Sequence, residues 1–178
     1  MNITIKLLEA QEVEPIGSSF DSTVWKDITP LLERYLAEQE RGKRVVLIAY
    51  IDNEFGGYVT IKWKSDYPSF AEKGIPEIND LRVLPAFRRR GIATALVDEA
   101  EKRIFERSPI AGIGVGMYAD YGAAQRMYAL RGYVPDGLGL AYKGQHVKPG
   151  HEVMVDDDLI LYLTKEKQKV NLINRCEE

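Results

Sequence analysis

The sequence predicts a single domain of the α/β class, of mixed α+β type, in which helices flank a central mixed sheet of about six or seven strands. Two observations favour this fold. Residues 45–63 contain two apolar runs joined by a glycine-containing turn, the pattern of a β-hairpin. After the hairpin, strand-like and helix-like segments alternate, which is typical of strands joined by crossover helices. The chain has 178 residues, a length that suits one domain spanning residues 1–178. A domain of this size can bury a substantial core without disulfides or metal.

The first half of the chain is predicted to contain one long helix and three strands. In the helical stretch apolar residues recur at intervals of three and four, which is typical of one buried helix face. Pro30 lies within this stretch and marks either a kink or a new helix start after Thr29. The predicted elements are a strand at 3–8, a helix at about 22–41, hairpin strands at 45–51 and 57–63 around a turn at 52–56, and a loop at 65–76.

The second half is predicted to alternate strands and helices. An apolar stripe runs along the first of these helices through Ala93, Leu96 and Ala100. Residues 165–178 are rich in charge, which favours a flexible C-terminal tail. The predicted elements are a strand at 77–83, a helix at about 91–106, a strand at 110–117, a helix at 122–130, a short strand at 132–134, a long loop, and a last strand at 158–164.

Composition narrows the classes of partner. The net charge of −3 disfavours nucleic acid. The chain has no run of about 18 apolar residues and its start has no signal pattern, so no membrane partner is predicted and the cytoplasm is the expected compartment. Cys176 is the single cysteine, and His146 and His151 have no companion cysteines, so no metal site is predicted.

A candidate anion-binding turn lies between the predicted strand at 77–83 and the helix that follows. The turn consists, in order, of Arg88, Arg89, Arg90, Gly91, Ile92 and Ala93. A helix start leaves N–H groups unpaired and carries partial positive charge, so a glycine-bearing turn flanked by arginines can hold a phosphate. Gly91 has no Cβ and lets the backbone approach closely. The alternative is a solvated basic turn, because such a short pattern occurs by chance in many proteins.

A second segment, residues 121–133, has small and aromatic residues at fixed offsets from one another. Its matching residues are Ala124, Met127, Tyr128, Gly132 and Tyr133. Together, the two segments resemble the GNAT acyltransferase superfamily, closely over residues 77–134 and only in the order of elements elsewhere. The resemblance implies that acetyl-CoA is the cosubstrate and that its pyrophosphate is held by the loop. The implied contacts are the backbone N–H groups of Arg88, Arg89, Arg90, Gly91, Ile92, Ala93 and Thr94.

The resemblance also implies roles for two tyrosines. Tyr128 falls on the family's general-acid position, and a phenol with a pKa of about 10 is neutral at pH 7 and can protonate the departing thiolate. Where many members carry an asparagine that contacts the pantetheine region, this chain has Tyr121. Tyr121 is therefore expected at the edge of the cofactor, and the alternative is a tyrosine without a ligand contact.

The general base is left open between two carboxylates and water. Glu77 resembles the carboxylate of the histone-type members, whereas Asp80 or a chain of waters are alternatives. If the strand alternates regularly, Glu77 and Asp80 point to opposite faces and only one of them faces the cleft. Backbone N–H groups of Leu81, Arg82 and Val83 are expected to polarise the thioester carbonyl, where a bulge could expose them.

The predicted strand at 110–117 carries glycine at every second position. Gly112, Gly114 and Gly116 would leave one face of that strand without side chains. One interpretation is a helix packed tightly on this face. The other is room for the pantetheine arm.

The predicted function is therefore that of an acetyl-CoA-dependent N-acetyltransferase. It would transfer the acetyl group directly to the primary amine of a small molecule, since no placed Cys or Ser nucleophile is visible. Alternatives are acetylation of a protein or peptide amine and a non-catalytic acyl-CoA sensor; a P-loop protein is disfavoured because Gly-Lys-Ser/Thr is missing. The sequence leaves the oligomeric state open, with a homodimer as one alternative. Acceptor recognition is expected at residues 25–40, 65–76 and 135–157, whose carboxylates weakly favour a cationic acceptor.

Overall fold

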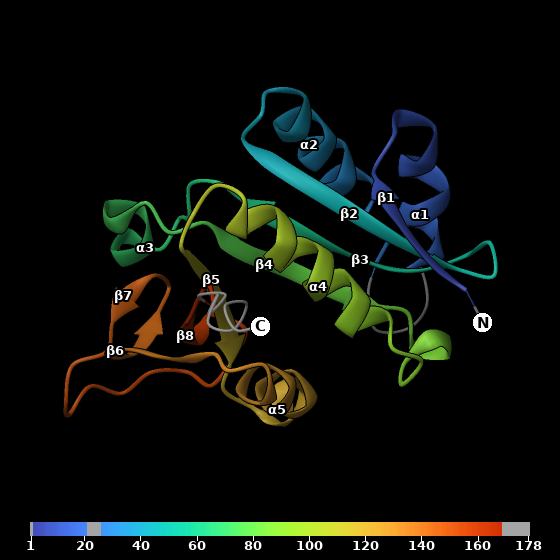
Figure 1. Cartoon of the computed structure of the whole chain (residues 1–178). Helices are drawn as coiled ribbons and strands as arrows, with labels where there is room; N and C mark the ends of the chain where they lie inside the picture. Colours follow the sequence, from blue (N-terminus) through green and yellow to red (C-terminus); the bar gives the residue numbers. More distant parts are fainter. Residues whose placement is uncertain (1, 21–25, 169–178) are drawn as a thin grey trace, which may run out of the picture.

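The computed structural model describes residues 2–20 and 26–168, which form one mixed sheet with helices on both faces (Figure 1). The predicted fold class is confirmed, and the sheet has eight strands, one more than the largest predicted number. The strands are β1 (Ile3–Leu7), β2 (Arg44–Ile51), β3 (Glu54–Lys62), β4 (Glu77–Val83), β5 (Ile110–Gly116), β6 (Val134–Tyr142), β7 (Gln145–His146) and β8 (Leu159–Glu166). The helices are α1 (Val13–Ser19), α2 (Thr29–Glu40), α3 (Pro68–Lys73), α4 (Ile92–Phe105) and α5 (Gly122–Leu130).

The strands follow the order β1-β2-β3-β4-β5-β8-β6-β7 across the sheet. Neighbouring strands from β1 to β4 are antiparallel, and so are those from β5 through β8 and β6 to β7. The central pair, β4 with β5, is parallel and is connected by the crossover helix α4. Short 3-10 turns precede α1, α4 and α5, at Ala10–Glu12 (η1), Pro85–Phe87 (η2) and Ala119–Tyr121 (η3).

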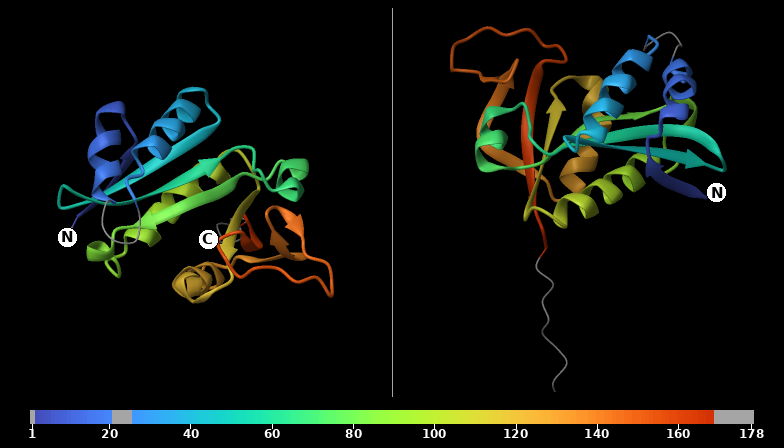
Figure 2. Two further views of the ribbon diagram at one scale, coloured as in Figure 1. Left: turned by 180° about the vertical axis from the view of Figure 1, so that it is seen from behind. Right: turned by 90° about the horizontal axis from the view of Figure 1, so that it is seen from above.

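Two apolar layers hold the helices against the sheet. Helices α1 and α2 cover one face, and α4 and α5 cover the other, as the views from behind and from above show (Figure 2). β2 is buried on both sides, since Leu47 packs in the α4 layer and Ile48 in the α2 layer. A strand covered on both faces needs an almost continuous apolar run, which is what residues 45–51 provide.

The structure differs from the prediction before and at the start of α2. α2 begins at Thr29 with Pro30 in its first turn, so the predicted new start is confirmed, whereas residues 26–28 are not helical. The rest of the predicted start, from residue 22, falls on residues outside the described part. The helix α1 is missing from the prediction because Pro15 and Gly17 interrupt its pattern. Gly17 allows a close approach, since a Cβ there would lie 2.1 Å from Thr29 Oγ1.

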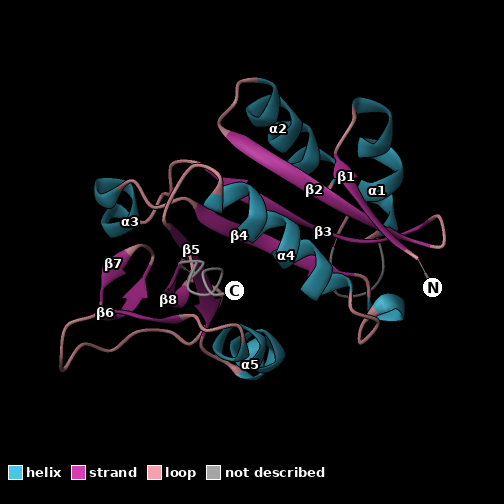
Figure 3. Cartoon of the chain, in the orientation of Figure 1, coloured by secondary structure: helices cyan, strands magenta, loops and turns pink. Residues whose placement is uncertain are grey.

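The predicted loop at 65–76 contains the short helix α3 (Figure 3). Pro68 stands in its first turn, and Gly74 ends it in a left-handed conformation with φ of 63°. The prediction was wrong here because a helix of six residues is too short to show a period.

The predicted short strand at 132–134 and the long loop after it were also wrong. β6 runs from Val134 to Tyr142 and pairs with both β8 and β7. Its register shifts between Pro135 and Leu140, where Gly137 and Gly139 have positive φ. This interruption removes the alternation by which a strand is recognised. β8 reaches Glu166 and so takes up the start of the predicted tail, whose residues from 169 onward lie outside the described part.

Candidate active site

The candidate site is centred where β4 and β5 separate. The two strands pair only at Glu77↔Gly112 and Ile78↔Ile113, although β4 continues to Val83 and β5 to Gly116. Beyond these two pairs the facing edges have no strand partner among the described residues. The Gly116 carbonyl accepts a hydrogen bond from Gln125 Nε2 and the Val83 carbonyl one from Arg88 Nε, and the other N–H and C=O groups along the edges suit an extended ligand. We call this region the β4–β5 split.

A β-bulge in β4 lies at the beginning of the split. Opposite β3, Thr60 pairs with Asn79 and Tyr58 pairs with Arg82, so two residues of β4, Asp80 and Leu81, face one residue of β3. Asp80 has φ of 52°, in the left-handed region. The predicted bulge therefore lies at positions 80–81, and it re-aims the backbone at the point where the neighbouring strand departs.

The bulge also overturns the expectation of regular alternation in this strand. Glu77 stands opposite Lys62 in the register, on the face that also carries Tyr58. Asp80 accepts a hydrogen bond from Tyr58, so it lies on this same face, toward α2. Glu77 and Asp80 thus share one face of β4, because the extra residue of the bulge cancels one step of the alternation.

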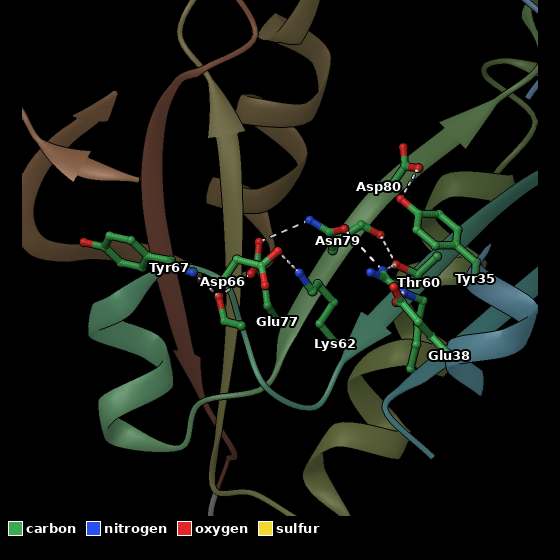
Figure 4. A network of polar contacts seen from close by, with 11 residues as sticks. Tyr35, Glu38, Thr60, Lys62, Asp66, Tyr67, Glu77, Asn79 and Asp80 are labelled. Carbon is green, nitrogen blue, oxygen red and sulfur yellow. Dashed lines mark hydrogen bonds and ion pairs between the residues drawn. The ribbon is translucent and has the colours of Figure 1, made fainter. Parts of the chain in front are cut away.

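Glu77 is deeply buried at the paired end of β4. Only 6% of its surface is exposed, and its carboxylate accepts hydrogen bonds from Ser65 Oγ and from Asn79 Nδ2 at 3.3 Å (Figure 4). Burial raises the pKa of Glu77 above its usual value, and the nearby Lys62 and the two hydrogen bonds offset part of this effect. A raised pKa suits a general base, whereas the enclosure means that an acceptor amine would have to reach Glu77 through water.

Asp80, the second of the two carboxylates, lies in the bulge and accepts three hydrogen bonds. Its Oδ2 accepts hydrogen bonds from Tyr35 Oη at 3.0 Å and Tyr58 Oη at 2.7 Å, and its Oδ1 accepts one from Arg82 Nε at 2.8 Å. The two tyrosines come from α2 and β3, and no sequence pattern marks them. Arg82, expected among the cofactor contacts, is thus engaged with Asp80, while the side chains of Leu81 and Val83 pack against the α4 layer.

The anion-binding turn has the backbone geometry of an open helix start. Arg89 and Gly91 both have positive φ, 60° and 84°, and Gly91 is the N-cap of α4. The first helical hydrogen bond is donated by Ala95 to the Gly91 carbonyl. Within the described residues, no acceptor is found for the six consecutive N–H groups from 89 to 94. Their dipoles and the helix start make this turn suited to a phosphate or pyrophosphate.

The three arginines of the turn are exposed, and two of them lie against the turn itself. Arg88 Nε contacts the Val83 carbonyl at 3.4 Å, and the Arg90 guanidinium lies 5.6 Å from the centre of the Phe87 ring. A groove of about 380 Å³ runs beside the turn between the start of α4 and α5. The groove is lined by Thr94, Ala123, Arg126, Met127, Leu130 and Arg131.

Tyr128 projects from α5 into the α4 layer. It is 4% exposed, and its ring centre lies 6.0 Å from that of Tyr133. Burial raises the pKa of Tyr128 to about 12, partly offset by Arg131. Among the described residues none is hydrogen-bonded to the Tyr128 hydroxyl. The phenol is therefore neutral at pH 7, and its proton is not committed to another group of the protein.

Comparison with known proteins places this geometry in a family. Residues 7–133 match the model of the acetyltransferase (GNAT) family. The chain belongs to the GNAT family. An uncharacterised N-acetyltransferase of Archaeoglobus fulgidus is 37% identical to this GNAT chain over 92 residues, which cover 50% of the chain and 59% of the relative. The match thus spans less than two thirds of that relative's own length.

Solved structures of the family share the fold at low sequence identity. The PaiA N-acetyltransferase of Thermoplasma acidophilum, in complex with coenzyme A, has a TM-score of 0.63 at 13% identity, covering 94% of this chain and 100% of that one. The spermidine/spermine N-acetyltransferase of Vibrio cholerae has a TM-score of 0.63 at 14% identity, covering 92% of each chain. These likenesses establish the fold of this GNAT domain.

Aromatic rings cover the glycine face of β5 in this GNAT domain. A Cβ on Gly112 would lie 2.3 Å from Phe70, and one on Gly116 would lie 2.4 Å from Tyr121. Over Gly114, a Cβ would lie 2.9 Å from Ile160 and 3.1 Å from Tyr162. The face is therefore neither open nor covered by helix backbone. Neither interpretation describes the face as found: single side chains from α3, η3 and β8 pack tightly on it in place of a whole helix.

Tyr121 stands at the end of β5, beside the split. Its hydroxyl donates a hydrogen bond to Asp157 Oδ1 at 2.9 Å, and Tyr118 donates another to the same oxygen. These hydrogen bonds lower the pKa of Asp157, and the charge of Arg82 adds a smaller lowering. Asp157 thus joins the segment before β8 to the residues that follow β5, although it lies in a short acidic run that is typical of solvated surface.

Neither a metal-binding cluster nor a membrane-spanning helix is found in the part of the chain that the structure describes. Residues 2–20 and 26–168 contain no group of three or more His, Cys, Asp or Glu side chains that could hold a metal ion. Over the same ranges, no helix combines the length and apolar character that crossing a membrane requires.

Glu77→Gln is expected to stabilise the protein at neutral pH but not in mild acid. The folded-state pKa of Glu77 is raised, so the native state binds more protons than the unfolded state above the ordinary carboxyl pKa. Wild-type stability must then fall as pH rises through this window, while the glutamine amide of the variant has no proton to lose. Urea unfolding of both proteins at about pH 4.5 and about pH 7.5 checks the prediction. A difference that does not grow with pH would contradict it.

Proposed function

We propose that this GNAT domain is an acetyl-CoA-dependent N-acetyltransferase that transfers the acetyl group directly to the primary amine of a small molecule. The observation that carries the proposal is the run of N–H groups from 89 to 94 at the start of α4, next to the β4–β5 split. Pyrophosphate is the part of acetyl-CoA that such a turn recognises. The coenzyme A complex of the Thermoplasma acidophilum neighbour, which has this fold, supports the same cosubstrate.

The remaining parts of acetyl-CoA have matching features on either side of the turn. The groove beside Thr94 contains Arg126 and suits the nucleotide end with its additional phosphate, whereas Arg131 in the same groove is already paired with Asp98 and Glu101. In the other direction, the unpaired edges of β4 and β5 suit the amides of the pantetheine arm. The bulge at Asp80 and Leu81 then lies where the thioester would end.

Three groups of the protein would perform the transfer. Backbone N–H groups of residues 81–83 would polarise the thioester carbonyl, and Tyr128 would donate its proton to the departing thiolate. Glu77, acting through water, would take the proton of the acceptor ammonium. Ser65 is the serine beside Glu77, but it is buried and its hydroxyl is engaged in hydrogen bonds with Glu77 and with the Tyr67 N–H, so we infer direct attack by the amine without a covalent intermediate.

A cationic small molecule is the proposed acceptor class. Support comes from Asp136 of β6, which accepts a hydrogen bond from Tyr67 of the loop before α3, and from Asp157 of the segment before β8, which accepts one from Tyr121 beside the split. The spermidine/spermine N-acetyltransferase among the neighbours acts, by its name, on acceptors of this kind. Carboxylates near an ammonium group raise its local concentration and hold it by charge-assisted hydrogen bonds.

The test is a screen of amines with acetyl-CoA, read out by the release of free thiol. The panel contains polyamines, amino sugars, amino acids and peptides with free α-amino or lysine amines. Turnover that is confined to small cationic amines supports the proposal. Turnover confined to peptides would show that the acceptor is a peptide or protein amine. Tight acetyl-CoA binding without turnover of any amine would show that the protein is an acyl-CoA sensor and not an enzyme.

Tyr121→Ala is expected to weaken acetyl-CoA binding several-fold, whereas Tyr121→Phe should do less. The ring fills the space over Gly116, which the phenylalanine variant preserves. Its hydroxyl contributes about 1 kcal/mol by the hydrogen bond that holds Asp157, and with it the segment before β8, beside the proposed cofactor site. Calorimetric titration of both variants measures the effect. Tyr118→Phe is the matched control, because it removes the other phenol from Asp157 while Tyr121 stays. Equal affinities for the wild type and for both Tyr121 variants would mean that Tyr121 has no part in the cofactor site.

A further inference from the structure

The conformation of Asp80 requires an explanation beyond the hydrogen-bonding of the sheet. A φ of 52° is a left-handed conformation that L-residues avoid, because their Cβ approaches the backbone carbonyl. Aspartate tolerates it better than most residues, but such a conformation persists only where the surroundings determine it. Asp80 forms the bulge together with Leu81, so whatever holds Asp80 also sets the direction of the backbone at the split.

Three donors from three elements hold the Asp80 carboxylate. Tyr35 from α2 and Tyr58 from β3 donate to one oxygen, and Arg82 from β4 donates to the other. Tyr35 is 5% exposed and Tyr58 is fully buried, so neither phenol can turn toward solvent. We call these four residues the Asp80 lock. Because the donors are fixed by separate parts of the core, the lock defines one position for the carboxylate.

The lock is itself braced by α2. The Tyr35 ring packs under the Arg44 guanidinium, whose carbon lies 4.0 Å from the ring centre. Arg44 is 4% exposed and donates to Glu38 Oε2 of α2 at 2.6 Å and to Thr60 Oγ1 of β3 at 2.6 Å. Figure 4 shows Tyr35 bonded to Asp80 and the network continuing from Thr60 to Asn79 and then to Glu77. The position of α2 is thereby transmitted to the bulge.

We propose that Asp80 is a positioning residue for acetyl transfer: the Asp80 lock holds the β4 bulge so that the backbone of residues 81–83 faces the thioester. The proposal rests on the proposed function for its catalytic consequence, whereas the geometry of the lock stands without it. A misplacement of about 1 Å at a reacting group can lower the rate about a hundredfold. A small relaxation of the bulge is therefore expected to lower kcat.

The competing role for Asp80 is that of the general base. Both of its oxygens already accept hydrogen bonds, one of them two, and all three donors belong to the lock. An acceptor amine would have to displace one of them to deliver its proton. A positioning residue needs the acceptor oxygens and the left-handed backbone but not the ability to take up a proton. Asparagine keeps one acceptor oxygen and tolerates the left-handed backbone, but it cannot take up the proton.

The experiment compares Asp80→Asn with Asp80→Ala. Asp80→Ala is expected to lower kcat about tenfold or more with the KM for acetyl-CoA within about twofold, and Asp80→Asn to recover kcat to within about fivefold of wild type. Asp52→Ala is the control. Asp52 is a second aspartate with positive φ, 49°, in the turn between β2 and β3, so its replacement imposes the same backbone strain away from the split. It should leave kcat unchanged.

Hydrogen exchange of the peptide containing residues 81–83 provides a readout independent of turnover. Exchange there is expected to accelerate about tenfold in Asp80→Ala and in the double variant Tyr35→Phe/Tyr58→Phe, and much less in Asp80→Asn. The proposal would be overturned if the Asp80→Asn protein lost as much activity as the Asp80→Ala protein while its own exchange at residues 81–83 stayed at the wild-type rate. That result would make Asp80 a proton acceptor. Unchanged exchange in the Asp80→Ala protein would overturn the proposal as well. A wild-type protein without turnover on any amine would refute the proposed function, while the exchange data would still decide on the lock.

Discussion

Tyr128→Phe is expected to lower kcat by about ten- to ten-thousand-fold while acetyl-CoA affinity changes little. The substitution removes one oxygen and keeps the ring, so the packing of α5 on the α4 layer is preserved. The hydroxyl is neutral at pH 7, because burial raises its pKa to about 12, and it has no partner among the described residues. Its loss therefore removes the proton for the departing thiolate without breaking a structural hydrogen bond. Steady-state kinetics together with calorimetric acetyl-CoA binding measure both parts.

Tyr133→Phe is the matched control for this prediction. Tyr133 lies in the same apolar layer, and its hydroxyl is the one buried side-chain oxygen in the described residues that has no hydrogen-bond partner. Removing it should leave kcat near the wild-type value and keep or slightly raise stability, because no hydrogen bond is lost. Wild-type turnover in the Tyr128→Phe protein would exclude Tyr128 from the mechanism. A loss of acetyl-CoA binding in that protein would instead make Tyr128 a structural residue.

The sequence predicted those parts of the site whose signals are local. The turn at 88–93 combines arginines, a glycine and a helix start, and the structure places Gly91 at the N-cap with φ of 84°. β4 and α4 were predicted within one residue of their bounds, since a regular strand and an amphipathic helix each show their own period. All of these features depend on residues that are close together in the chain.

The arrangement of Glu77 and Asp80 could not be predicted in the same way. Regular alternation puts them on opposite faces, and only the bulge brings them to one face. The bulge depends on Asp80 contacts with Tyr58 and Tyr35, which lie 22 and 45 residues away in the chain. Both tyrosines fit an ordinary apolar pattern, in which nothing distinguishes a hydroxyl that binds a carboxylate from one that contacts water.

The glycines of β5 are an intermediate case. Glycine at alternate positions predicted close approach on one face, and the rings over Gly112 and Gly116 confirm close packing. The partners themselves were out of reach of the sequence. Phe70 lies in α3, which is too short to show a helical period, and Tyr121 ends the three-residue turn η3, in which no pattern marks a ring that packs on β5. A strand face that carries only glycines thus predicts that another part of the protein or a ligand packs closely on it. Which group packs there depends on the tertiary fold.

Gly91→Val is expected to abolish measurable acetyl-CoA binding while the protein remains folded. The glycine has φ of 84°, a conformation that a β-branched residue cannot adopt without strain of about 1–2 kcal/mol or more. Space is not the obstacle, because the nearest atom to an added Cβ would be Ile3 Cδ1 at 3.8 Å. The backbone must therefore rotate, and the N–H groups from 89 to 94 would no longer converge on one phosphate. Isothermal titration calorimetry with acetyl-CoA measures the loss.

Gly42→Val separates this local effect from a general loss of stability. Gly42 follows α2, has φ of 69°, and has no atom within 4 Å of an added Cβ, so the substitution imposes comparable backbone strain in an open turn. Because that turn lies outside the β4–β5 split and the helix start, the Gly42→Val protein should lose stability and keep its acetyl-CoA affinity. Undiminished affinity in a folded Gly91→Val protein would remove the arginine-glycine turn from the cofactor site. Equal losses of affinity in both variants would trace the effect to folding, because only position 91 controls the N–H groups at the start of α4.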